Sequence, residues 1–127
     1  MMPDTLARWH HLVNNQDVAG LDSLLADDVV FYSPIVHAPQ AGKEITKHYL
    51  AAALQVFCNE SFEYVRELAD GHGAILEFQV EIEGVTVNGV DMIRWDEKGK
   101  IVEFKVMLRP IKAINLIGEK MAAMLGS

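Results

Sequence analysis

Apolar residues recur every three or four positions in three early segments of the chain, residues 4–15, 18–26 and 43–57. This spacing predicts three helices, each with one apolar face. Asp4 and Asp17 stand at the start of the first two segments and can accept hydrogen bonds from the free N–H groups there. The apolar stripe of the third segment consists of Ile45, Tyr49, Ala52 and Val56.

Alternating apolar and polar residues, the pattern of a strand with one buried face, replace the helical period later in the chain. The predicted strands are residues 27–34, between the second and third helices, and then 62–68, 74–83, 85–95 and 100–109. Short turns rich in Gly, Asp and Glu join the last four, which predicts antiparallel hairpins. A final helix is predicted at residues 110–125. This order predicts one α+β domain over residues 1–127, with a mostly antiparallel sheet covered by the early helices.

The two faces of the sheet can be assigned from the cleanest alternation. In the second hairpin strand the apolar set is Leu76, Phe78, Val80 and Ile82, and the polar set is Glu77, Gln79, Glu81 and Glu83. In the last strand we assign Phe104, Val106 and Leu108 to the buried face, in preference to Ile101, Glu103, Lys105 and Met107. Helices rarely cover a strongly curved sheet completely, so we expect an apolar cavity that binds a small molecule.

Asp91 interrupts the apolar face that Val87, Ile93 and Trp95 form in the strand 85–95. Asp is disfavoured inside strands, and an ionised carboxylate is costly to bury unless it is paired. Burial would raise its pKa and make it a general acid or hydrogen-bond donor at the floor of a pocket. The alternative is a buried Asp that a hydroxyl, an indole N–H or a histidine satisfies for structural reasons. The adjacent Asn88-Gly89 pair is a competing turn signal that a bulge would also explain.

Composition excludes several classes of function. The 127 residues carry a net charge of −7, which argues against binding to nucleic acid or anionic membranes. Cys58 is the single cysteine, so neither an intrachain disulfide nor a cysteine metal cluster is expected. The first residues lack the apolar run of a signal peptide, and no stretch reaches the ~20 apolar residues of a membrane span. We therefore expect a soluble, cytoplasmic protein.

Three segments, together with the order of elements, carry a resemblance to a known superfamily. They are ARWHHLVNNQDVAGLDSLLADDVVFYSP, the helix start Gly42-Lys43-Glu44-Ile45, and GVDMIRWDEKGKIVEFKV. The chain resembles the nuclear transport factor 2-like (NTF2-like) superfamily and, within it, the SnoaL-like and ketosteroid-isomerase-like proteins. The resemblance implies a cone with an apolar pocket, and often a homodimer through the outer face of the sheet. Members include isomerases, polyketide cyclases, dehydratases, epoxide hydrolases and binding proteins, so the fold alone does not fix a function.

The match to the family's functional residues is partial. Ketosteroid isomerases carry a general-base Asp before the proline that ends the first strand, where this chain has Ser33. Their oxyanion-hole Tyr in the first helix corresponds to Trp9, whereas their second oxyanion donor, an Asp, corresponds to Asp91. Steroid isomerisation by the family mechanism is therefore not expected. Limonene-type epoxide hydrolases place an Arg where this chain has Gly89, while the acid/base carboxylate of SnoaL-type cyclases fits Asp91.

The remaining candidates are polar residues near the expected pocket mouth. His37, in the loop after the first strand, is the candidate general base, with a ring of His10 or His11 as the alternative. Ser33 could hydrogen-bond Asp91 or a ligand, or could simply end the strand. No spacing of His and carboxylates suits a metal, and no cofactor is expected. The expected ligand-binding residues, several of which could equally be core, are Trp9, Val13, Phe31, Tyr49, Phe57, Phe62, Phe78, Ile93, Phe104 and Val106.

These observations predict a domain that binds a small apolar or aromatic carbonyl compound. If it is an enzyme, Asp91 would support proton transfer next to the carbonyl, as in isomerisation, cyclisation or dehydration. The alternative is a non-catalytic ligand-binding or dimeric interaction module. The C-terminal helix is expected to pack against the domain, a lid or a dimer arm being the alternatives.

Overall fold

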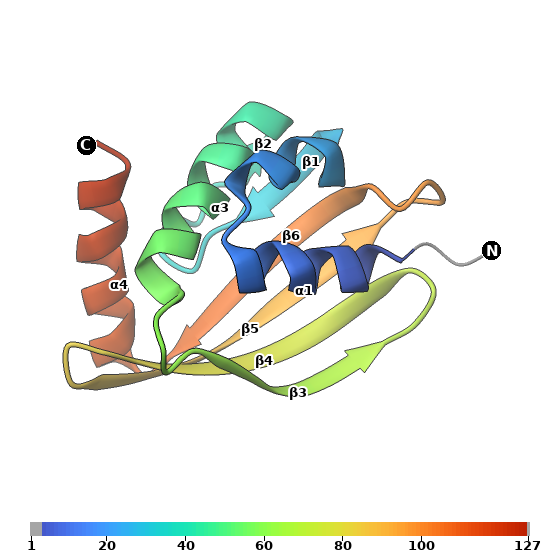
Figure 1. The fold of residues 1–127 in the computed structure, drawn as a ribbon. Helices are drawn as coiled ribbons and strands as arrows, with labels where there is room; N and C mark the ends of the chain where they lie inside the picture. The colour runs from blue at the N-terminus through green and yellow to red at the C-terminus, as the bar shows by residue number, and fades with distance from the viewer. Residues whose placement is uncertain (1–3, 127) are drawn as a thin grey trace.

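The computed structural model, which describes residues 4–126, is a curved six-stranded sheet with helices over one of its faces (Figure 1). The helices are α1 (Thr5–Asn15), the 3-10 helix η1 (Val18–Gly20), α2 (Leu21–Leu24), α3 (Lys43–Phe57) and α4 (Ile111–Met124). The strands are β1 (Leu25–Tyr32), β2 (Gln40–Ala41), β3 (Glu63–Ala69), β4 (Gly73–Ile82), β5 (Val85–Trp95) and β6 (Ile101–Arg109). This architecture confirms the predicted α+β class and the NTF2-like cone.

The sheet has the strand order β2-β1-β6-β5-β4-β3, in which only β1 and β6 are parallel. The two-residue strand β2, which the sequence did not predict, pairs antiparallel with the end of β1. The predicted second helix over 18–26 is wrong in extent, because α2 ends at Leu24. Leu25 is extended and fully buried, and it pairs with Ile101 of β6. Pairing with the sheet therefore ends the helix early.

The predicted inner face of β4 is confirmed, since Leu76, Phe78, Val80 and Ile82 are all buried. On β6 the assignment needs one correction. Phe104 is buried as predicted, but Ile101, assigned to the outer face, is also fully buried. The register between β5 and β6 shifts between Arg94 and Trp95, so that Trp95 pairs with Ile101. This shift puts Ile101 on the same face of the sheet as Phe104, so both side chains lie in the core.

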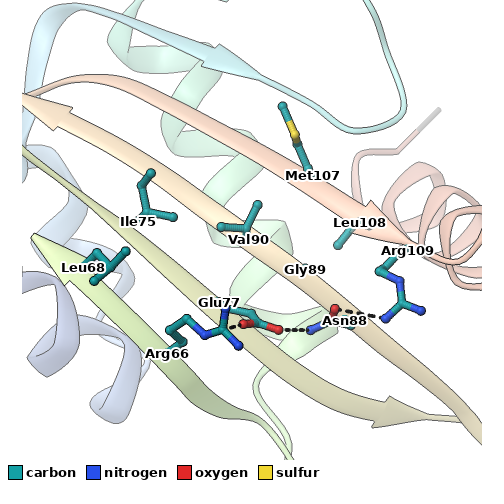
Figure 2. Close-up of a pocket in the computed structure, with 10 residues that line it drawn as sticks. All are labelled: Arg66, Leu68, Ile75, Glu77, Asn88, Gly89, Val90, Met107, Leu108 and Arg109. Atoms are coloured by element: carbon teal, nitrogen blue, oxygen red, sulfur yellow. Dashed lines mark hydrogen bonds and ion pairs between the residues drawn. The ribbon is translucent and has the colours of Figure 1, made fainter.

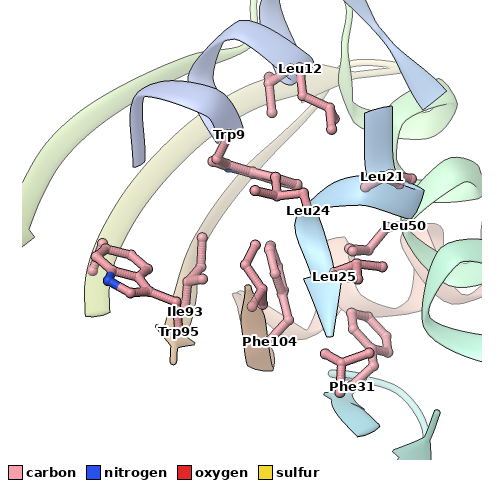
Figure 3. Packing of buried hydrophobic residues seen from close by; sticks show 14 of the residues in the cluster. Trp9, Leu12, Leu21, Leu24, Leu25, Phe31, Leu50, Ile93, Trp95 and Phe104 are labelled. Atoms are coloured by element: carbon pink, nitrogen blue, oxygen red, sulfur yellow. The ribbon is translucent and has the colours of Figure 1, made fainter. Parts of the chain in front are cut away.

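The main core lies between the sheet and the helices α1, α2 and α3 (Figure 3). Trp9 of α1 packs on Phe104 of β6, with 4.9 Å between the ring centroids. The stripe expected for α3 is confirmed only at Ala52, which is buried, while Tyr49 is only partly buried. The other buried residues of α3 are Thr46, Leu50 and Leu54. A second cluster joins α4 to the far ends of β4 and β5. No helix among residues 4–126 is long and apolar enough to cross a membrane.

Gly89 lies within a regular stretch of β5 and forms neither a turn nor a bulge. It pairs with Phe78 on one side and Leu108 on the other, without a break in register. A Cβ atom here would lie 2.5 Å from Cζ of Phe78, 2.7 Å from Cδ2 of Leu108 and 2.8 Å from the backbone oxygen of Met107. All three distances are too short for a contact, and the backbone oxygen has no side-chain rotation with which to move aside. Glycine is therefore required so that these side chains can cover the strand beside Asp91.

Candidate functional site

Asp91 lies on the inner face of β5, with 7% of its surface exposed, between Leu76 of β4 and Val106 of β6. The hydroxyl of Tyr64, on β3, donates a hydrogen bond of 2.8 Å to Oδ2 of Asp91. The indole Nε1 of Trp9, on α1, donates in turn to the Tyr64 hydroxyl at 3.0 Å. A chain of donors from a helix and an edge strand therefore ends on one buried carboxyl group.

Burial raises the pKa of Asp91 to about 7, even though the hydrogen bond from Tyr64 opposes this change. Burial and the negative charge of Asp91 raise the pKa of Tyr64 well above its ordinary value, so its hydroxyl stays protonated. Near neutral pH, Asp91 therefore exists in both protonation states. A carboxyl group with such a pKa can both give and take a proton under physiological conditions.

A cavity of about 50 Å³, here called the Asp91 cavity, lies against this carboxyl group. Its walls come from α1, α3 and the inner face of the sheet, and apart from Asp91, Tyr64, Trp9 and Cys58 they are formed by apolar side chains. The lining residues are Trp9, Val13, Phe31, Leu50, Ala53, Leu54, Phe57, Cys58, Phe62, Tyr64, Phe78, Asp91, Phe104 and Val106. The site therefore offers one acidic group to a mostly apolar ligand.

A second cavity, of about 170 Å³ and here called the α4 cavity, lies between α3, α4 and the loop after β1. Its lining residues are Phe31, Ser33, Pro34, Ile35, Val36, Tyr49, Ala53, Phe57, Val106, Ile117, Gly118, Met121, Ala122 and Leu125. Four of them, Phe31, Ala53, Phe57 and Val106, also line the Asp91 cavity. The two cavities are therefore neighbours that share a wall.

The structure gathers most of the predicted site around Asp91. Eight of the ten predicted ligand-binding residues line the Asp91 cavity: Trp9, Val13, Phe31, Phe57, Phe62, Phe78, Phe104 and Val106. Tyr49 lines only the α4 cavity. Ile93 is buried in the main core and lines neither cavity.

Ser33 and His37 are not brought to Asp91. The Ser33 Oγ accepts hydrogen bonds from the backbone N–H groups of Ile35 at 3.0 Å and Val36 at 3.3 Å, and so shapes the loop that walls the α4 cavity. His37 is exposed on that loop and lines neither of the two cavities. His10 lies closer to the network, because its ring packs edge-on against Tyr64 while its Nε2 contacts Glu67.

Sequence reasoning missed Tyr64 and Cys58 as members of the site. Tyr64 could have been predicted as a partner of Asp91, because it has a hydroxyl on the inner face of β3 and a buried Asp needs a hydrogen-bond partner. The half-buried Cys58 follows directly after α3, and burial together with Asp91 raises the pKa of its thiol. Among residues 4–126, no group of three or more His, Cys, Asp or Glu side chains is arranged to hold a metal ion.

Comparison with known proteins identifies a matching family and similar solved structures. The sequence profile of the SnoaL-like domain matches residues 6–104. A steroid delta-isomerase from Pseudomonas aeruginosa is 43% identical, with a TM-score of 0.90 over 96% of this chain and 89% of that one. An uncharacterised bacterial protein with a cystatin-like fold from Silicibacter pomeroyi is 33% identical, with a TM-score of 0.87 over 96% and 85%.

A more distant structure shares the fold alone. An NTF2-like protein of unknown function from Mesorhizobium loti is 20% identical, with a TM-score of 0.72 over 84% of this chain and 89% of that one. No curated protein matches the chain.

Proposed function

We propose that this chain, which belongs to the SnoaL-like domain family, binds a small, mostly apolar molecule through one carbonyl or phenolic oxygen at Asp91. The observation that carries the proposal is the buried carboxyl group with a pKa of about 7 in the wall of an apolar cavity. In its neutral form Asp91 donates a hydrogen bond to a carbonyl oxygen. In its ionised form it accepts a hydrogen bond or a proton from the ligand.

The proposed reaction class is proton transfer next to the carbonyl group, as in isomerisation, cyclisation or dehydration. Asp91 supplies the acid or the base, and the Trp9–Tyr64 donor chain holds its carboxyl group in place. The relative from Pseudomonas aeruginosa, named a steroid delta-isomerase, supports this class of chemistry at 43% identity. Ser33 argues against the family's own isomerase mechanism, because its Oγ is engaged with the backbone of its loop.

Binding without catalysis is the second candidate. The Tyr64 hydroxyl already satisfies one oxygen of Asp91, as a structural role for this carboxyl group would require. No histidine lines the Asp91 cavity, so a second acid/base group of that kind does not face the ligand. Measured turnover, rather than measured binding, separates the two candidates.

The experiment measures binding of phenol and of cyclohexenone by calorimetry, and conversion of a β,γ-unsaturated ketone to its conjugated isomer by absorbance. We expect the ligands to bind wild type, and we expect Asp91→Ala to lower their affinity at least tenfold. If the chain is an enzyme, Asp91→Asn abolishes turnover, because an amide acts neither as an acid nor as a base near neutral pH. Asp28→Asn, at an exposed carboxylate on β1, is the matched control and changes neither measurement.

Three outcomes decide between the readings. Turnover that Asp91→Asn removes supports the enzyme. Binding that depends on Asp91, without turnover of this and other carbonyl substrates, supports the non-catalytic module. Affinities that Asp91→Ala leaves unchanged, or no binding by wild type, would contradict the proposed site.

We further propose a homodimer that forms through the outer face of the sheet, which carries no helix among the described residues (Figure 1). Leu68, Ile75 and Met107 are exposed there at 67%, 44% and 51%, around a hollow of about 390 Å³. A row of polar contacts runs beside them across four strands, from Arg66 through Glu77 and Asn88 to Arg109 (Figure 2). An apolar patch beside satisfied polar groups is typical of a protein interface.

A further inference from the structure

The Asp91 cavity is too small for the whole of the proposed ligand. A cavity of roughly 150 Å³ takes up one benzene molecule. The volume of about 50 Å³ beside Asp91 therefore has room for a carbonyl group and little more. The rest of a ligand whose oxygen reaches Asp91 must lie elsewhere.

The α4 cavity, directly next to the Asp91 cavity, offers space for the rest of the ligand. It has about 170 Å³, enough for a ring of benzene size or a short alkyl chain. Phe31, Ala53, Phe57 and Val106 line both spaces, so only side chains separate them. A ligand that passes Ala53 and Phe57 could reach from one into the other after small rotamer changes.

We propose that the α4 cavity is the subsite for the apolar body of the ligand, whose single oxygen lies at Asp91. This inference rests on the proposed function and adds the class of ligand. None of the side chains that line the α4 cavity carries a charge, so the body of the ligand is uncharged and apolar. The ligand is therefore an elongated molecule with one carbonyl or phenolic oxygen at one end and a hydrocarbon ring or chain at the other.

Helix α4 contributes one wall of the α4 cavity. The SnoaL-like match ends at residue 104, whereas α4 begins at Ile111. Glycine is unfavourable inside a helix, yet Gly118 stands in the middle of α4. A Cβ atom at Gly118 would lie 3.6 Å from the side chain of Ile35, an ordinary contact distance, so the loop after β1 lies against the helix at this point. Together the loop and α4 close the outer side of the cavity.

The test is a series of methyl ketones, from 2-pentanone to 2-nonanone, whose binding to the full chain is measured by calorimetry. Affinity should rise about fourfold for each additional buried methylene group until the cavity is full. Ala122 is exposed but lines the α4 cavity, so Ala122→Phe places a ring at the rim of this cavity. The variant should lower the affinity for 2-nonanone at least tenfold, with 2-pentanone changed less than twofold. Ala123→Phe, at the exposed neighbouring position outside the lining, is the matched control and should change neither.

Affinity that does not rise with chain length would overturn the subsite. Equal effects of Ala122→Phe and Ala123→Phe on 2-nonanone would do the same. In either case the proposed function stands if phenol still binds and still depends on Asp91, so the two failures are distinguishable. If no ketone binds, the subsite falls, and the phenol measurement alone decides the function.

Discussion

Asp91 should make the stability of the folded chain depend on pH. The pKa of an Asp in an unfolded chain is about 3.9, whereas burial raises the pKa of Asp91 to about 7 in the fold. Between these values the folded state holds a proton that the unfolded state has released, so the free energy of unfolding falls as the pH rises from about 4 to about 7. Above about pH 7 the fold no longer gains stability from the protonated Asp91. The total decrease in the free energy of unfolding between pH 4 and pH 7 is on the order of 4 kcal/mol.

Urea unfolding at intervals from pH 4 to pH 8 measures this dependence. Asp91→Asn should make the free energy of unfolding nearly independent of pH between pH 4 and pH 7. Relative to wild type, the variant should gain most stability above pH 7, where wild type must bury the ionised carboxylate. Asp28→Asn keeps the wild-type slope because this carboxylate is exposed. Equal slopes in wild type and Asp91→Asn would show that the carboxyl group does not hold its proton in the fold.

The residues of the site differ in how far the sequence could predict them. Asp91 stood out because a carboxylate broke an alternating apolar face, and the structure buries it there. Tyr64 could not be paired with it, because β4 lies between their strands and the reach of the hydroxyl depends on the curvature of the sheet. Periodicity gives the face of a residue but no distance across strands. His37 lies in a loop, where no period fixes a direction.

At the scale of elements, the ends of helices and strands were predicted best where one hydrophobic period runs without interruption. Helix α3 and strand β5 begin and end at the predicted residues, because each is a long single-period run between clear turn signals. The border between α2 and β1 was misplaced, since Leu24 and Leu25 are both buried and fit either period. Only pairing with β6 decides that Leu25 is extended, and that is a long-range contact.

The helices α1 and α3 each contain one buried threonine, and only one of the two hydroxyls has a hydrogen-bond partner among the described residues. Substitution with valine should therefore change the free energy of unfolding in opposite directions at the two positions. Thr5 of α1 donates a hydrogen bond of 2.8 Å to the carbonyl oxygen of Gly99 in the turn between β5 and β6. The Thr46 hydroxyl of α3 is buried with no hydrogen-bond partner among the described residues. Thr5→Val should lower the free energy of unfolding by about 1–3 kcal/mol, because it leaves that carbonyl oxygen without its donor.

Thr46→Val should instead raise the free energy of unfolding by about 1 kcal/mol, because it removes an unsatisfied hydroxyl without changing the shape of the side chain. Each variant is the control for the other in one set of urea unfolding curves. A loss of stability in Thr46→Val equal to that in Thr5→Val would show that the Thr46 hydroxyl has a partner after all.

At the scale of the whole molecule, the two faces of the sheet have opposite roles. The inner face is covered by helices (Figure 1) and carries the buried Asp91. On the outer face Leu68, Ile75 and Met107 are exposed. The chain carries a net charge of −7, so two copies repel each other at long range and a dimer must gain its stability from close apolar contact. A charged residue substituted in the middle of this exposed apolar patch should therefore disrupt the proposed dimer.

Ile75→Glu together with Met107→Glu should convert the proposed dimer into a monomer in sedimentation velocity. Each glutamate would bring an ionised group into the interface without a partner, at a cost of several kcal/mol per buried charge, which exceeds what a patch of this kind can offset. Val18→Glu, at a position 42% exposed in η1 on the helical side, is the control and should leave the dimer intact. Since both outer-face positions point away from the Asp91 cavity, the monomer should still bind phenol. A wild-type chain that sediments as a monomer at every concentration would contradict the dimer and leave the ligand site untouched.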